Sequence, residues 1–242
     1  MKIWAHRGCS QCYPENTILA FEKAVAIEGL CGIELDIQLT KDGTMVVCHD
    51  EKVDRTTSGI GFIKDYTFEE IRRLVIGAAD GSVWKIPTIE EVLDLLQEPM
   101  KRGFRLNIEL KNSNIPYEGM EEKIVSLVHD RGIEKSVVYS SFSAKSMEKV
   151  RSLDPDAETG ILDSKVSDCL YKLRGGTGAN ALHPYWKGID LPAEALKDYT
   201  VRAWFSGHLY PEKPNGNRLD LAALEAKGIT DVFLNEPEVY LL

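Results

Sequence analysis

Apolar and polar residues alternate most regularly in the stretch 32–50. Within it, Glu34 and Asp36 are set among apolar residues, and side chains two apart on a β-strand point to the same face. An Asp-Gly turn at 41–44 then leads into a second apolar run at 45–48, a pattern typical of a β-hairpin. We therefore predict two carboxylates on one face of a strand that is followed by an antiparallel return.

His49 comes directly after this hairpin. The antiparallel return is expected to bring its imidazole back towards Glu34 and Asp36. Two carboxylates and an imidazole near one strand end suit metal binding and proton transfer. A solvated strand tip is the alternative that this stretch alone leaves open.

Strand-like and helix-like runs alternate along the rest of the chain. Strands are expected at 2–5, 29–36, 104–110, 136–139, 158–162, 179–182, 201–205 and 231–234. Helices are expected at 17–28, 67–75, 117–130, 144–153, 166–173, 193–198 and 219–226. Asn16 is the expected N-cap of the first helix, and Thr88 and Glu91 have capping-box spacing at the start of a further one.

The strand count indicates the architecture. The run 45–48 follows a hairpin, so it must be antiparallel, and eight strands joined by helical crossovers remain. This pattern predicts an α/β fold, a TIM (βα)8 barrel forming a single domain over 1–242, with a small insertion at about 51–86 after the hairpin. An open doubly wound sheet is the alternative, and it is disfavoured because no glycine fingerprint follows the first strand.

Composition narrows the classes of function. The 242 residues are 43% hydrophobic and 28% charged, as in globular proteins, and the formal net charge of −9 argues against nucleic-acid binding. No apolar run is long enough to span a membrane, and the first strand begins at Lys2, so we expect a cytoplasmic protein without stable membrane insertion. Five cysteines fit reduced thiols, and the role of Cys9 and Cys12 stays open.

Ionisable residues collect where the barrel strands end, which is the active-site face of this fold. His6 ends the first strand, and Glu109 ends the strand after the insertion. Together with Glu34 and Asp36, Glu109 gives three carboxylates whose repulsion a hard divalent cation would relieve. The alternative is that these acids pair with nearby Arg7 or Lys111 and bind no metal.

The remaining polar residues suggest how such a site would react. His6 and His49 suit general acid and base catalysis near neutrality, although the sequence does not assign the two roles. Arg7 and Lys111 are placed to bind the oxygens of a phosphate group. His129 is expected at the surface, and His208 is unassigned.

A set of short motifs recurs in order: His6-Arg7-Gly8, Pro14-Glu15-Asn16-Thr17, Glu34-Leu35-Asp36, His49-Asp50, Asp54-Arg55-Thr56-Thr57, Ile86-Pro87-Thr88 and Glu109-Leu110-Lys111. In order and spacing they resemble the glycerophosphodiester phosphodiesterases. The resemblance is strong to about Phe142 and weaker through Trp204.

This resemblance implies hydrolysis of small glycerophosphodiesters to sn-glycerol 3-phosphate and an alcohol. It also implies an Mg²⁺ or Ca²⁺ ion at Glu34, Asp36 and Glu109. The implied acid and base are His6 and His49, and the implied phosphate ligands are Arg7 and Lys111. Glu15, His183 and Trp204 are implied pocket or supporting residues.

Two departures from the family pattern affect the alcohol side of the pocket. Phe205-Ser206 follows the Trp204 strand, and Asn235-Glu236 replaces the usual Thr-Asp. The alcohol preference, the metal and the oligomeric state are not set by the sequence.

Two other functions stay open. One is cleavage of lysophospholipids, for which the insertion offers Ile60, Phe62 and Ile63 as membrane contacts. The other is a catalytically silent barrel that binds phosphate esters.

Overall fold

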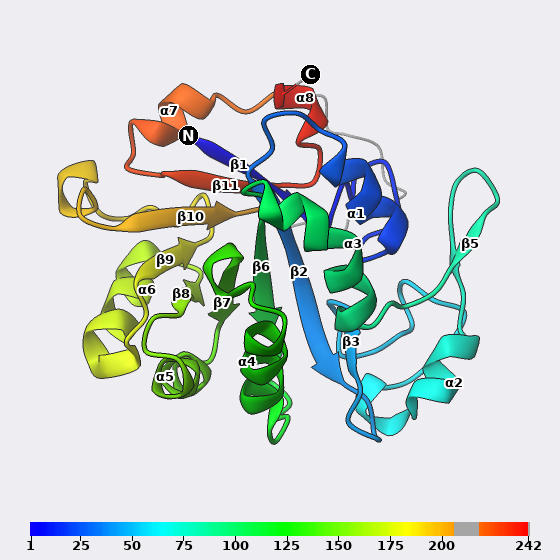
Figure 1. Cartoon of the computed structure of the whole chain (residues 1–242). Coiled ribbons are helices and arrows are strands. Elements are labelled where there is room, and N and C mark those ends of the chain that lie inside the picture. The colour runs from blue at the N-terminus through cyan, green and yellow to red at the C-terminus, as the bar shows by residue number, and fades with distance from the viewer. Residues whose placement is uncertain (206–217, 242) are drawn as a thin grey trace.

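The structure is a computed structural model that describes residues 1–205 and 218–241. Among these residues, eight parallel strands form a barrel that closes where β1 pairs with β2 (Figure 1). The strands are β1 (Lys2–His6), β2 (Gly32–Leu39), β6 (Arg105–Leu110), β7 (Val137–Ser141), β8 (Glu158–Asp163), β9 (Ala181–Pro184), β10 (Thr200–Trp204) and β11 (Asp231–Leu234). The prediction of a TIM barrel is confirmed.

Helices cover the outside of the barrel (Figure 1). They are α1 (Ile18–Val25), α3 (Ile89–Lys101), α4 (Met120–Asp130), α5 (Ala144–Leu153), α6 (Val166–Lys172), α7 (Leu221–Glu225) and α8 (Glu238–Leu241). Shorter turns of helix are η1 (Ile63–Asp65), η2 (Glu134–Ser136), η3 (Leu173–Thr177) and η4 (Ala193–Ala195). One hydrophobic cluster joins apolar residues of α3, such as Val92 and Leu96, to the outward side chains Leu35 and Ile37 of β2.

The inward side chains of the strands divide the barrel into a packed half and an open half. Near the amino ends, Trp4, Val138 and Phe233 form a small buried cluster. Beside it Arg202 pairs with Glu158 and lies 3.5 Å from Asp231, which closes this end with paired charges. The space at the carboxyl ends of the strands is therefore where a ligand can enter.

The hairpin after β2 is confirmed. Strand β3 (Met45–Val47) pairs antiparallel with the end of β2, and Gly43 in the turn has a φ of 79°. Such a left-handed conformation favours glycine, which explains the Asp-Gly sequence. β2 runs to Leu39, three residues past its expected end, because β3 extends its pairing beyond the rim.

The segment that follows β3 contains α2 (Phe68–Arg73) and a two-stranded sheet of β4 (Ile76–Gly77) and β5 (Val83–Trp84). The helix begins with a capping box formed by Thr67 and Glu70. Its apolar residues share a second cluster with Val46 of the hairpin. The single-domain organisation with an insertion at about 51–86 stays a prediction.

Several local expectations were wrong. The N-cap of α1 is Thr17 and not Asn16, because the Thr17 side chain accepts a hydrogen bond from Ala20 N. The helix expected at 193–198 is only the short 3-10 turn η4. Ile63, expected among the exposed apolar residues of the insertion, is buried.

Two positions considered above, Ser206 and His208, lie outside the described residues. In the part of the chain that is described, no helix has the length and apolar character needed to cross a membrane.

Candidate active site

A cavity of about 230 Å³ opens at the carboxyl end of the barrel. Its charged and polar lining residues are His6, Arg7, Glu34, His49, Asn107, Glu109, Ser140 and His183. Its apolar lining residues are Phe142, Leu162, Trp204, Phe205 and Phe233. The charged residues lie on or directly after β1, β2, β3 and β6, whereas the apolar ones come from β7 onwards.

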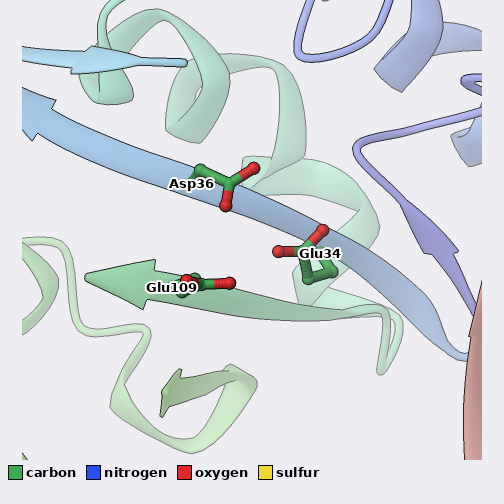
Figure 2. A group of neighbouring side chains, drawn as sticks. All are labelled: Glu34, Asp36 and Glu109. Atoms are coloured by element: carbon green, nitrogen blue, oxygen red, sulfur yellow. The ribbon is translucent and has the colours of Figure 1, made fainter. Parts of the chain in front are cut away.

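The register of neighbouring strands brings the three predicted carboxylates together. Glu34 and Asp36 are inward residues of β2, and Asp36 lies opposite Glu109 of β6. One carboxylate oxygen of each lies within 4.8 Å of the other two. Figure 2 shows the three side chains close together on the neighbouring strands β2 and β6.

The electrostatics of this cluster suit a hard cation. Burial, and then the charges of Asp36 and Glu109, raise the pKa of Glu34 well above its usual value. Burial would also raise the pKa of Asp36, but the positive charges around it outweigh burial and lower that pKa. Oδ1 of Asp36 is buried and has no hydrogen-bond partner among the described residues. An all-oxygen ligand set that includes a buried acceptor without a hydrogen bond fits a divalent ion such as Mg²⁺ or Ca²⁺.

Arg7 lies beside this cluster in a strained conformation. Its φ is 58°, and its backbone N–H donates to Oε2 of Glu34 over 3.1 Å. Its guanidinium donates to Glu15 over 2.9 Å, and its Nε lies 3.6 Å from Asp36. The conformation therefore turns the guanidinium towards the acids at the barrel mouth.

Lys111 follows β6 on the other side of the cluster. Its Nζ donates to Glu109 over 2.9 Å and lies 3.8 Å from Asp36. The acids thus pair with Arg7 and Lys111, as one alternative expected, and also form a group that could hold a metal ion.

Glu15 and Arg55 join the first loop to the segment after β3. Arg55 donates to both carboxylate oxygens of Glu15 over 2.8 Å. Burial alone would raise the pKa of Glu15, but hydrogen bonds from Arg55 and the charge of Arg7 lower it to about 2. Glu15 is therefore an ionised bridge between two arginines.

His6 is oriented by the last strand of the barrel. Its Nδ1 lies 2.5 Å from Oδ1 of Asn235, and its Nε2 lies 3.8 Å from Glu34. Since an amide oxygen only accepts, the proton lies on Nδ1 and Nε2 keeps a lone pair. Burial, followed by the charge of Arg7, lowers the pKa of His6 to about 3.

His49 has a different partner. Its Nδ1 donates to Oδ1 of Asp50 over 2.7 Å, and Arg55 in turn donates to Asp50 Oδ2 over the same distance. His49 thus has a carboxylate as its acceptor, whereas His6 has an amide oxygen. His6 and His49 therefore differ in their supporting groups.

Gln38 fixes the backbone around His49. Its Nε2 donates to the carbonyl oxygens of Cys48, His49 and Asp50 over 2.9, 3.3 and 2.7 Å. Its Oε1 accepts from the hydroxyl of Tyr117 over 2.9 Å. This buried amide holds the end of the hairpin in place.

Sequence reasoning missed four supporting residues. Gln38 gave no local signal, and Asn235 was noted only as a departure from the family pattern, because the partners of both residues lie in other segments. Asp50 and Arg55 belong to motifs noted in the sequence, but no role in the site was predicted for either residue. Asn16, the expected N-cap, instead donates from Nδ2 to Asp36 over 2.9 Å.

Other candidate residues are placed as follows. Trp204 lies on the aromatic side of the cavity, with ring centroids 6.0 Å from Phe142 and 4.9 Å from Tyr185. His183 is fully buried in the cavity wall. His129 is half-exposed and bonds Asp154 over 2.9 Å, as expected for a surface residue.

The two cysteines of the first loop are free thiols. Burial, and then a hydrogen bond to Glu238, raise the pKa of Cys12 to about 11. Burial likewise raises the pKa of Cys9. Neither environment favours a reactive thiolate.

Comparison with known proteins identifies relatives. The Glycerophosphoryl diester phosphodiesterase family model matches residues 6–179. A glycerophosphodiester phosphodiesterase of Caldanaerobacter subterraneus subsp. tengcongensis is 36% identical over 244 residues, covering 99% of this chain and 96% of the relative. A glycerophosphodiester phosphodiesterase of Bacillus subtilis is 35% identical, covering 98% and 84%.

A solved structure is also similar. It is a phosphodiesterase of Oleispira antarctica in complex with the product sn-glycerol-3-phosphate. The TM-score is 0.77 with 26% sequence identity, and the match covers 99% of this chain and 94% of that one.

Proposed function

Since the chain belongs to the glycerophosphoryl diester phosphodiesterase family, we propose that its barrel-mouth cavity hydrolyses glycerophosphodiesters to sn-glycerol 3-phosphate and an alcohol. The observation that carries this proposal is the convergence of His6, His49 and Arg7 on the cavity that Glu34 and Glu109 line. Asp36 completes the carboxylate cluster, and Lys111 bonds to it. The Oleispira antarctica relative, whose structure contains sn-glycerol-3-phosphate, supports this product.

Glu34, Asp36 and Glu109 are the residues that would hold a divalent ion, Mg²⁺ or Ca²⁺. Such an ion supplies positive charge that polarises a phosphate oxygen and stabilises developing negative charge. Two observations support this assignment. Burial and the charges of Asp36 and Glu109 raise the pKa of Glu34, and the buried Oδ1 of Asp36 makes no hydrogen bond to a described residue.

Arg7 and Lys111 bind the phosphate oxygens in this proposal. Both side chains lie against the carboxylate cluster, which keeps their charges at the barrel mouth. Local positive charge is needed because the whole chain carries a net charge of −9 and repels anions at a distance. Charge-assisted contacts of this type also strengthen as negative charge develops on the oxygens.

The two histidines exchange protons with the reacting groups. His6, with its proton on Nδ1 held by Asn235, accepts the proton of the nucleophile at Nε2. His49, whose Nδ1 bonds the carboxylate of Asp50, donates a proton from Nε2 to the leaving alcohol oxygen. This division follows from the partner of each Nδ1, an amide in one case and a carboxylate in the other.

The experiment that tests the function is release of glycerol 3-phosphate from glycerophosphocholine. We expect release by the purified protein and loss of release after treatment with EDTA. His6→Ala and His49→Ala should each lower kcat by about 10²- to 10⁴-fold. Activity that persists after chelation, or in either variant, would contradict the mechanism.

A further inference from the structure

Lys172 belongs to the helical layer outside the barrel, yet its side chain reaches the rim of the cavity. It is the last residue of α6, and it borders an outer groove of about 460 Å³ that residues of α5 and η3 also line. Long side chains on a helix extend back towards the start of the helix. In this direction the ammonium group of Lys172 meets the ends of two barrel strands, β7 and β8.

The ammonium group joins these two strands where their backbone pairing ends. The last paired residues are Ser141 of β7 and Ile161 of β8. Phe142 and Leu162 come next, and their carbonyl oxygens both accept hydrogen bonds from Nζ of Lys172, over 3.0 and 3.4 Å. The same two residues line the cavity. A cation outside the barrel therefore holds the backbone of two residues of the cavity wall.

Asp163 completes the surroundings of the ammonium group and links it to a third residue of the wall. Its carboxylate forms an ion pair with Lys172 over 2.7 Å, and its backbone carbonyl accepts from Nε1 of Trp204 over 3.3 Å. The ring of Trp204 lies edge-on to that of Phe142, with centroids 6.0 Å apart. An ammonium group has three donors, so two carbonyls and one carboxylate use its full capacity.

These contacts act on only one half of the cavity. Phe142, Leu162 and Trp204 are apolar lining residues, whereas the groups proposed for proton transfer and phosphate binding lie on or directly after β1, β3 and β6. An apolar wall touches the substrate to the same extent before and during the reaction, so it contributes to binding and not to the chemical step. A displaced wall should therefore raise KM and leave kcat nearly unchanged.

We propose that Lys172 is a positioning residue, which holds the apolar wall of the cavity from behind and thereby sets the affinity for the substrate. Without its ammonium group, the carbonyl oxygens of Phe142 and Leu162 lose a charged donor, and Asp163 loses its ion-pair partner. The ends of β7 and β8 are then free to separate, and the rings that they carry lose their fixed positions. This inference rests on the proposed function, because it assumes that a diester occupies this cavity.

The test is steady-state hydrolysis of glycerophosphocholine in the presence of Mg²⁺ or Ca²⁺. Lys172→Met keeps most of the length of the side chain and removes its donors. We expect KM to rise about tenfold, the loss expected for roughly one hydrogen bond to a charged group, while kcat stays within about threefold of the wild type. Lys149→Met is the matched control, since it makes the same substitution at an exposed lysine of α5 that pairs with Glu122. It should leave both constants unchanged.

Two further variants and a second measurement guard against a general folding effect. Lys172→Arg keeps the charge and the donors, so its KM should lie closer to that of the wild type. Asp163→Asn removes the charge that faces the ammonium group but keeps the carbonyl that Trp204 bonds, and it should raise KM by a smaller factor. Hydrogen exchange should accelerate at residues 142–145 and 162–165 in Lys172→Met, but not around His6. Lys149→Met should exchange like the wild type.

An unchanged KM in Lys172→Met, or a fall in kcat at constant KM, would overturn the role of Lys172. If Lys172→Met does not fold, an unchanged KM in Asp163→Asn overturns it instead.

These results are separate from the function itself. A wild type that releases no glycerol 3-phosphate contradicts the proposed function. Faster exchange at 142–145 and weaker binding of sn-glycerol 3-phosphate by Lys172→Met would then still support the positioning role, whereas unchanged exchange and binding would overturn it.

Discussion

Oδ1 of Asn235 lies 2.5 Å from Nδ1 of His6, although 229 positions separate the two residues in the chain. The contact exists because the barrel closes with β11 beside β1, where Ala5 pairs with Leu234. His6 follows Ala5, and Asn235 follows Leu234, so these two residues are also neighbours. Closure of the barrel thus orients an imidazole at the active site.

We expect Asn235→Leu to lower kcat by about 10- to 100-fold, because the ring of His6 loses the acceptor that fixes its tautomer. The melting temperature should change little, since leucine has a similar volume. Asn235→Asp keeps an acceptor oxygen and is the matched control, which should retain more activity. Equal kcat values for wild type and Asn235→Leu would contradict the role of Asn235.

Gln38→Leu should both destabilise the protein and reduce activity. Three backbone carbonyls and the hydroxyl of Tyr117 lose their partner, at a cost of about 1–3 kcal/mol in the free energy of unfolding. Hydrogen exchange at residues 48–50 should accelerate in the variant. Tyr117→Phe removes only the hydroxyl that bonds Gln38, so it should leave exchange there unchanged and serves as the control.

Stability should depend on pH through Glu15. Its pKa is lowered from 4.5 to about 2 in the folded protein, so its contribution is complete above about pH 5 and is lost as pH falls towards 2. The shift corresponds to about 3 kcal/mol at most. Unfolding measurements on the wild type and Glu15→Gln should differ most near neutral pH and converge at about pH 2 and below. A constant difference across this range would show that the charge of Glu15 does not matter.

A divalent ion should stabilise the fold through the three carboxylates. At a concentration about a hundredfold above Kd, ligand binding adds about 3 kcal/mol to the free energy of unfolding. Thermal unfolding with Mg²⁺ or Ca²⁺, compared with EDTA, should therefore show a higher melting temperature. Glu109→Gln should reduce this increase. Glu98→Gln, the same substitution at an exposed residue, is the control and should not reduce it. Identical melting curves with ion and with EDTA would argue against a metal site.

The fold could be predicted because its signals are local. Alternation of strands and helices, the Asp-Gly turn before Met45 and the Thr88–Glu91 capping box are each contained in a few residues, and the structure has all of them. The errors occur where long-range contacts override a local preference. Asn16 is a residue type common at N-caps, but its φ is 55° and its amide donates to Asp36 of β2.

In the candidate site, too, local patterns could be predicted and long-range contacts could not. The carboxylates could be placed together for two reasons. Strand periodicity sets the face to which they point, and the barrel architecture puts the carboxyl ends of their strands on one side. The residues that orient the histidines could not be identified, since Gln38 and Asn235 act through partners set by strand register. The small strands β4 and β5 were missed because two residues each give no periodic signal.

The central claim is that one cavity brings together a divalent ion, a phosphate group and two histidines. Its most direct test is a crystal structure of the protein with Mg²⁺ or Ca²⁺ and sn-glycerol 3-phosphate. We expect the ion at Glu34, Asp36 and Glu109, with the phosphate beside Arg7 and Lys111 and within reach of His6 and His49. An ion bound elsewhere, or a phosphate out of reach of both histidines, would contradict the account.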